Sequence, residues 1–186
     1  MKPLLTTIPI FSMTSRWIYL FIFICLSLVL KVDAQDVAEG VVKFTRLYAD
    51  SSGDTHLLDC TVQAMERKKL PGGESPQYVR DLGNITSGLT LTQMQGDNPW
   101  HQCPTSQFVV VLEGSWFINT TAGDYIEMGP GHVLYQDDYK GLVVNGVSPV
   151  HFSGSLHDAP CNQMIVSTAS REAVPNDFSC DWVDFV

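Results

Sequence analysis

Positive charge is scarce in this sequence, which carries 11 Lys and Arg residues against 20 Asp and Glu, a formal net charge of −9. A nucleic acid presents a dense row of phosphates, and a surface with this charge balance repels it. The composition therefore excludes nucleic-acid binding as an expected function. The acidic balance names no other partner, because net charge serves mainly to keep a protein soluble.

The sequence also lacks an apolar run long enough to cross a bilayer as a helix. Its longest apolar segment covers residues 17–30, whereas a membrane-spanning helix needs about 20 residues. Arg16 precedes this segment and the small residues of 32–34 follow it, which is the pattern of a cleaved secretory signal. We therefore expect a signal peptide at 1–34 and a secreted domain at 35–186 with no membrane span. The alternative is an uncleaved signal anchor that tethers the chain to a membrane.

Cysteines are few, and one of the five, Cys25, lies in the expected leader. Exported domains commonly form disulfides, so the other four are expected to make two bridges, for which three connectivities exist. We favour a bridge between Cys161 and Cys180, which would tie the C-terminal tail to the last expected strand. The second bridge would then join Cys60 and Cys103.

Two triplets have the form of N-glycosylation acceptors, Asn84-Ile85-Thr86 and Asn119-Thr120-Thr121. Such triplets arise by chance, but two of them beside expected turns, in a chain with a signal, favour a glycosylated protein. We expect glycans at Asn84 and Asn119.

No segment of the mature chain shows the apolar period of an amphipathic helix. Short stretches instead alternate apolar and polar residues or are wholly apolar, and Gly, Pro and Asn separate them. This pattern predicts a single all-β domain, a sandwich or a barrel. The expected strands are 40–48, 56–65, 85–94, 108–112, two short strands within 116–128, and then 132–136, 142–147, 150–155 and 162–168. Other expectations are a polar loop at 66–83, a turn at 96–99, burial of 108–112 on both faces, and a tail at 170–186 that folds back on the domain.

One stretch carries a set of residues with a regular spacing. It reads Trp100-His101-x-Cys103-Pro104-x-x-Gln107, an apolar strand to Leu112, and Gly114, followed later by Gly123 and Gly129-Pro130-Gly131. This stretch resembles the paired motifs of the cupin superfamily of RmlC-like barrels, and it is most similar to the short single-domain cupins of bacteria. The resemblance covers about residues 41–141. It implies a cupin-type antiparallel β-barrel, the double-stranded β-helix or jelly roll.

In cupins the paired motifs hold a divalent metal with three His and one carboxylate. By position, the resemblance places His101 at the first ligand, Cys103 at the second, Gln107 at the carboxylate and Leu134 at the last His. An amide and a leucine lack the anionic charge that offsets metal dehydration, so we expect a degenerate site. The residues that could still surround one ion of Mn, Fe, Ni, Cu or Zn are His56, His101, Gln107 and Asp138, with Trp100, Cys103 and Tyr135 in the pocket.

The remaining histidines are weaker candidates. His132 lies beside a turn, and His151 and His157 flank a late strand without a spaced partner. The sequence shows no Ser or Cys motif with a spaced base and acid, and no Gly-rich phosphate loop.

Two functions are compatible with these observations. The first is a secreted barrel that binds a small molecule, such as a carbohydrate or an organic acid, or that has kept only a structural role. The alternative is a metal-dependent enzyme of the dioxygenase, isomerase or lyase type, with His101 and His56 as ligands and Tyr135 as an acid. Many cupins pair through edge strands, so the resemblance also allows a homodimer.

Overall fold

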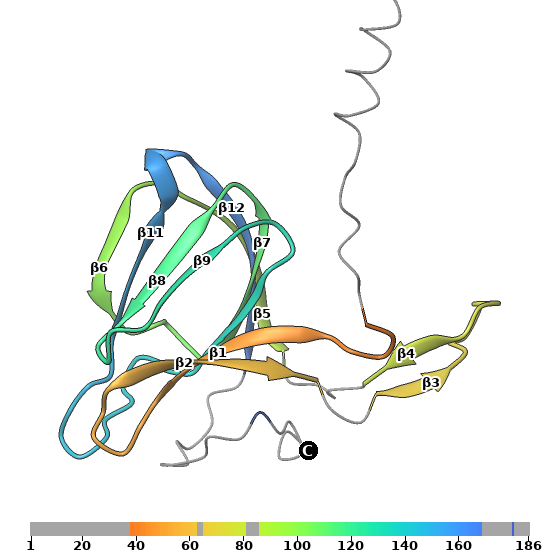
Figure 1. Ribbon diagram of the computed structural model, residues 1–186, viewed down its shortest axis with the longest axis horizontal. Helices are drawn as coiled ribbons and strands as arrows, with labels where there is room; N and C mark the ends of the chain where they lie inside the picture. Colours follow the sequence, from red (N-terminus) through yellow and green to blue (C-terminus); the bar gives the residue numbers. More distant parts are fainter. Residues whose placement is uncertain (1–37, 63–64, 81–85, 169–179, 181–186) are drawn as a thin grey trace, which may run out of the picture. The chain divides into compact units, whose positions relative to one another are not determined.

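The computed structural model describes residues 38–62, 65–80, 86–168 and 180 (Figure 1). Apart from a short 3₁₀ turn at Leu156–Asp158, regular structure in these ranges is all β, a jelly-roll type barrel of largely antiparallel strands. No helix in this part of the chain is long and apolar enough to cross a bilayer. The strands are β1 (Lys43–Ala49), β2 (Thr55–Thr61), β3 (Glu66–Lys68), β4 (Gln77–Val79), β5 (Thr86–Met94), β6 (Asp97–His101), β7 (Gln107–Glu113), β8 (Trp116–Thr120), β9 (Tyr125–Met128), β10 (Val133–Gln136), β11 (His151–Ser155) and β12 (Cys161–Thr168).

Two sheets form the barrel, with six strands in the order β2-β1-β10-β7-β12-β5 and four in the order β6-β11-β8-β9. The pairs are antiparallel, except that β1 and β10 run parallel. Because β10 lies beside β7, the segment after β10 meets the segment before β7. The amide of Lys140 donates to the carbonyl of Cys103 at 2.7 Å there. This topology brings two distant parts of the sequence to one end of the barrel.

The core lies between the two sheets. Alternation along β7 and β8 sends every second side chain inward, where β7 contributes valines and β8 contributes Trp116 and Ile118. Full burial of a valine or isoleucine side chain stabilises the fold by about 1.5–3 kcal/mol. The buried members are Leu47, Val109, Val111, Trp116, Ile118, Met128, Leu134 and Cys161.

A second apolar cluster lies on the outer face of the six-stranded sheet. Phe44, Cys60 and Tyr135 are buried in it, and Cys180 packs against them. A disulfide joins Cys60 to Cys180 across 120 residues of sequence. The tail cysteine is therefore held against the outside of the barrel, not against its last strand.

This disulfide differs from the predicted pairing. Cys103 and Cys161 are free and buried. Cys103 lines a cavity between the two sheets, and Cys161 belongs to the core. The predicted bridges Cys161–Cys180 and Cys60–Cys103 are wrong, because Cys60 belongs to the outer cluster and the two free thiols lie on the inner side of the sheets.

Most predicted strands are confirmed to within a few residues at their ends. Residues 66–83 contain the β3–β4 hairpin and not only a loop. β6 begins directly after Gly96, so the predicted turn at 96–99 lies largely on a strand. Residues 142–147 form no strand, because Val144 and Val147 hydrogen-bond to each other across a tight turn. The leader 1–34, Asn84 and the tail after 168, apart from Cys180, lie outside the described residues.

The strand β7 is buried mainly on one face. Gln107, Val109 and Val111 are buried, whereas Phe108 is half-buried and Leu112 is exposed. The prediction of burial on both faces is therefore wrong at the end of this strand. The turn that follows depends on Gly114, because its φ is +79° and a Cβ there would collide with the carbonyl of Pro160.

Candidate functional site

A cavity of about 450 Å³ lies between the two sheets. Its lining comes from β5, β7, β10 and β12 of the larger sheet and from β6, β8 and β11 of the smaller one. Val109, Trp116 and Ile165 supply apolar surface, and most of the remaining lining is polar. The volume is in the range of pockets that bind small molecules.

A chain of four buried polar side chains leads from one side of this cavity. The Asp138 carboxylate accepts a hydrogen bond from Nδ1 of His151 at 2.6 Å. Nε2 of His151 accepts from the Gln136 amide at 3.2 Å, and the Gln136 carbonyl accepts from Gln107 Nε2 at 2.7 Å. The exposed fractions are 6% for Gln107, 2% for Gln136, 0% for Asp138 and 1% for His151. These hydrogen bonds require His151 to donate from Nδ1 and to accept at Nε2.

His101 lies next to His151 in the cavity wall, with the two ring centroids 4.3 Å apart. Its Nδ1 is 2.7 Å from the carbonyl of Pro99, and its Nε2 is 2.9 Å from the amide nitrogen of Asn98. The carbonyl only accepts, so Nδ1 carries the proton and Nε2 accepts from Asn98. Burial lowers the pKa of His101, and His151 lowers it further by repulsion between the two rings when charged. Both effects favour the neutral form of His101.

Cys103 also lines the cavity, as a free thiol with 1% of its surface exposed. Burial raises the pKa of this thiol far above its usual range, and the negative charge of Asp138 together with a hydrogen bond to it acts in the same direction. A thiol attacks as the thiolate, so Cys103 is unsuited to act as a nucleophile. Its position instead stabilises the buried carboxylate of Asp138.

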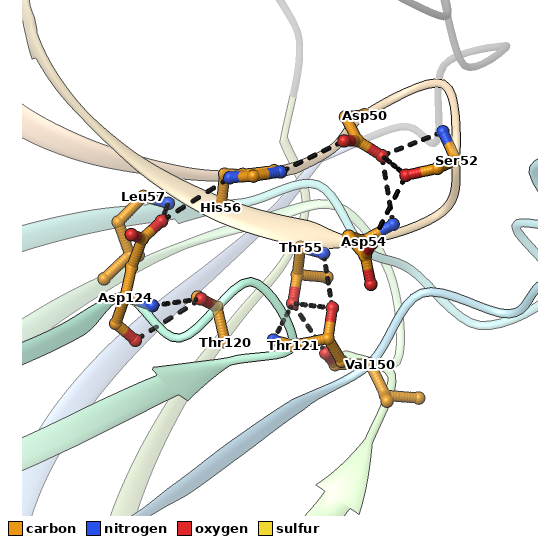
Figure 2. A network of polar contacts seen from close by, with 10 residues as sticks. All are labelled: Asp50, Ser52, Asp54, Thr55, His56, Leu57, Thr120, Thr121, Asp124 and Val150. Atoms are coloured by element: carbon orange, nitrogen blue, oxygen red, sulfur yellow. Dashed lines mark hydrogen bonds and ion pairs between the residues drawn. The ribbon is translucent and has the colours of Figure 1, made fainter.

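His56 is not among the residues that line this cavity, and Figure 2 shows it in a separate network of polar contacts. His56 Nε2 lies 3.1 Å from Asp50 and Nδ1 lies 3.7 Å from Asp124, so the ring bridges two acidic side chains. Thr55, next along β2, is buried and donates to the carbonyl of Val150 at 2.8 Å. His56 shares the face of β2 that carries Leu58 and Cys60 of the outer cluster. It therefore does not join His101, Gln107 and Asp138.

Two predicted pocket residues also face outward. Trp100 is 50% exposed, and its ring meets Phe152 edge-on with centroids 5.9 Å apart. Tyr135 lies in the outer cluster, where its ring is 4.8 Å from that of Phe108. Burial, followed by the charge of Asp137, raises the pKa of Tyr135 to about 12. Of the predicted pocket residues, Cys103 alone lines the cavity.

The residues at the cavity do not fit a three-His-one-carboxylate metal centre. No group of three His, Cys, Asp or Glu side chains in the described part of the chain is arranged to hold a metal ion. His101 and His151 each have Nδ1 tied to an oxygen, which would orient Nε2 for a metal, but each Nε2 already accepts from an amide. Asp138 is engaged by His151 and Cys103. The carboxylate ligand that a cupin-type metal centre needs is therefore missing from this cavity.

Sequence reasoning missed His151 and Gln136, which complete the polar chain. The sequence signal for His151 is weak, because Asp138 precedes it by 13 positions with an irregular segment between them. Gln136 ends β10 opposite Gln107 of β7, a pairing that depends on the strand register. Only a correct pairing of β10 with β7 would have brought these side chains together.

The comparisons with known proteins identify no family for this chain. No family model matches the sequence, and no curated protein sequence matches it significantly. Protein NMB1881 from Neisseria meningitidis is 17% identical over 44% of this chain and 72% of its own, with a TM-score of 0.33. A cupin-2 domain containing protein from Shewanella frigidimarina NCIMB 400 is 21% identical over 43% of this chain and 68% of its own, also with a TM-score of 0.33. The assignment to the all-β jelly-roll class therefore rests on the strand order and pairing described above.

Proposed function

We propose that this protein is a secreted cupin-type, RmlC-like barrel that binds a small neutral molecule in the cavity between its sheets. The observation that carries this proposal is a set of three buried polar atoms in the cavity lining. Trp116 Nε1, Ser153 Oγ and Gln163 Nε2 have no hydrogen-bond partner among the described residues, although all three residues are at most 4% exposed. A buried polar atom without a partner costs about 1–3 kcal/mol, and a ligand oxygen would remove that cost.

The charges around the cavity favour a neutral ligand over an acid. Among the described residues no Lys or Arg lines it, and the charged side chains at or behind its lining are the carboxylates of Asp97 and Asp138. An organic acid would bring a further negative charge into a site without a cation to pair with it. The indole N–H of Trp116 requires an acceptor, so the ligand carries hydroxyl, ether or carbonyl oxygens. A carbohydrate-like molecule fits these requirements better than an organic acid.

Binding can be tested by isothermal titration calorimetry on the disulfide-intact domain. The titrants are a panel of neutral monosaccharides with methyl glucoside as the reference, and glucuronate as the matched anion. We expect neutral sugars to bind and the anion to bind more weakly. Ser153→Ala should weaken binding about 3- to 10-fold, the value of one neutral hydrogen bond.

The control is Ser87→Ala, because Ser87 is an exposed serine of β5. It should leave the affinity unchanged. Tighter binding of glucuronate than of methyl glucoside, or equal affinities of Ser153→Ala and the parent protein, would contradict the proposal.

A metal-dependent enzyme is the second candidate, and the close His101–His151 pair is the observation that favours it. Elemental analysis of the secreted protein, beside His101→Ala and His151→Ala, separates the two functions. Near-stoichiometric transition metal that is lost in both variants would support the enzyme. Metal-free parent protein would reject it.

A further inference from the structure

The outer face of the four-stranded sheet carries a row of aromatic side chains, one from each strand. The row runs Trp100 of β6, Phe152 of β11, Phe117 of β8 and Tyr125 of β9, and successive ring centroids are 5.9, 5.8 and 5.8 Å apart. We call it the aromatic row. Its ends are well exposed, with 50% of Trp100 and 53% of Tyr125 accessible to solvent. Aromatic surface of this extent on one face of a sheet usually has something packed on it.

A glycosylation acceptor lies inside this row. Asn119 is on β8, and its register partners are Phe152 on one neighbouring strand and Tyr125 on the other. Phe117 precedes Asn119 by two positions and therefore points to the same face. Aromatic rings thus flank Asn119 on both sides and along its own strand. Its carboxamide makes no hydrogen bond to any residue that the structure describes, so it is free to carry a substituent.

Gly154 shapes the surface next to this asparagine. It lies opposite Phe117 in the register, and a Cβ at Gly154 would come within 2.7 Å of the Phe117 ring. Because Gly154 has no side chain, the Phe117 ring packs closely over β11. It lies nearly parallel to the Phe152 ring, at an interplanar angle of 27°. The two rings form a flat apolar shelf beside Asn119.

We propose that Asn119 carries an N-linked glycan and that its first N-acetylglucosamine packs on the aromatic row. In this modification the Asn119 amide nitrogen bonds to the anomeric carbon of a lipid-linked oligosaccharide; the lipid diphosphate leaves and the amide loses one proton. One face of the sugar ring presents C–H groups, which pack on aromatic rings as other apolar groups do. Attachment to Asn119 places this face next to Phe117, Phe152 and Tyr125 at high effective concentration.

This occupant fits the face better than a second copy of the chain. The third residue of the acceptor triplet, Thr121, is exposed and directly follows β8. A glycan on Asn119 would project from the aromatic row. A sugar chain at that point would block face-to-face packing of two barrels. The glycan would also remove from solvent the aromatic surface that otherwise promotes association.

The full chain, secreted from eukaryotic cells, provides the test. Intact-mass and peptide mass spectrometry report occupancy at Asn119 and Asn84, and endoglycosidase trimming leaves a single N-acetylglucosamine at each occupied site. We expect Asn119 to be occupied. The trimmed protein should melt at least about 2 °C above Asn119→Gln, because a contact worth about one kcal/mol shifts the melting temperature by that amount in a domain of this size.

A double-mutant cycle then identifies the contact. The difference between the trimmed protein and Asn119→Gln should vanish in a Phe152→Ala background, with Tyr125→Ala as a second background should Phe152→Ala fold poorly. Asn84→Gln is the matched control, and its effect should be the same in all backgrounds.

Three results would overturn the proposal. The first is an empty Asn119, whether or not Asn84 is modified in the same protein. The second is an Asn119→Gln effect that stays unchanged when the aromatic rings are removed. The third is a glycosylated protein that elutes as the same dimer as Asn119→Gln, because the aromatic row would then face another copy of the chain.

Discussion

The buried pair of Asp138 and His151 should contribute much of the stability around the cavity. The carboxylate is fully buried and lies 2.6 Å from Nδ1 of His151, whose side chain is 1% exposed. Asp138→Ala leaves the His151 proton and the Cys103 thiol without an acceptor in a site that water does not reach. A buried donor without an acceptor costs about 1–3 kcal/mol, and two donors lose theirs, so the expected loss is about 2–6 kcal/mol. A domain of this size loses about 2–4 °C of melting temperature per kcal/mol, so the expected decrease is about 4–24 °C.

Asp138→Asn separates loss of the hydrogen bonds from loss of the charge. The asparagine oxygen can still accept from His151, and its amide nitrogen would face Cys103, whose sulfur is a weak acceptor. The cavity shape is unchanged. We therefore expect Asp138→Asn to cost only about 1–2 kcal/mol, clearly less than Asp138→Ala.

Urea unfolding of the disulfide-intact protein, followed by tryptophan fluorescence at neutral pH, gives both values. Glu74→Ala is the control for loss of an acidic residue, because Glu74 is exposed in the loop between β3 and β4; it should change the free energy of unfolding by less than about 0.5 kcal/mol. Equal losses for Asp138→Asn and Asp138→Ala, or a loss below about 1 kcal/mol for Asp138→Ala, would refute the reasoning.

Three further outcomes are expected. Replacing Cys60 and Cys180 together by Ser removes a link across 120 residues of sequence and should lower the free energy of unfolding in urea by about 4–5 kcal/mol; a loss below about 1 kcal/mol would contradict this. Burial raises the thiol pKa of both Cys103 and Cys161, so neither should react with iodoacetamide in the native protein at mildly alkaline pH, and both should react in denaturant; mass spectrometry would expose any native labelling. Hydrogen bonds, of which the one from the Ser52 hydroxyl is the strongest, lower the pKa of Asp50 from its usual 3.8 to about 2. The contribution of the Asp50 carboxylate to stability is therefore present above about pH 4 and is lost as the pH falls towards 2. Asp50→Asn should flatten that part of an acid unfolding profile, and an unchanged profile would argue against it.

The sequence was sufficient to predict the strands but not how their faces are oriented. Period-two alternation predicts β2 well, yet both of its faces carry apolar residues, with Leu57 packed on the core and Leu58 on the outer cluster. Either face could therefore point inward, and His56 moves with that choice. The prediction placed His56 at the cavity because it chose the wrong face of β2 as the inward one. The two faces have the same apolar pattern.

The cysteine pairing could not be predicted for a related reason. The choice among three connectivities depends on which cysteines lie outside the barrel, and Cys60 is buried by an outer cluster that mimics a core. Cys103 and Cys161 look equally apolar in sequence, but they lie inside, one at the cavity and one in the core. Burial alone does not distinguish a core thiol from a thiol under a surface cluster.

The outer face of each sheet carries a feature that depends on export of the chain, whereas the cavity between the sheets does not. The larger sheet has the Cys60–Cys180 disulfide on its outside, and the smaller sheet has the aromatic row around Asn119. A disulfide persists in oxidising compartments, and the proposed glycan is added to exported chains. Each sheet would thus be covered on its outer side by a feature that export provides. The lining of the cavity still carries the unsatisfied polar atoms of Trp116, Ser153 and Gln163, and this is the reason to look for the ligand there and not on the surface.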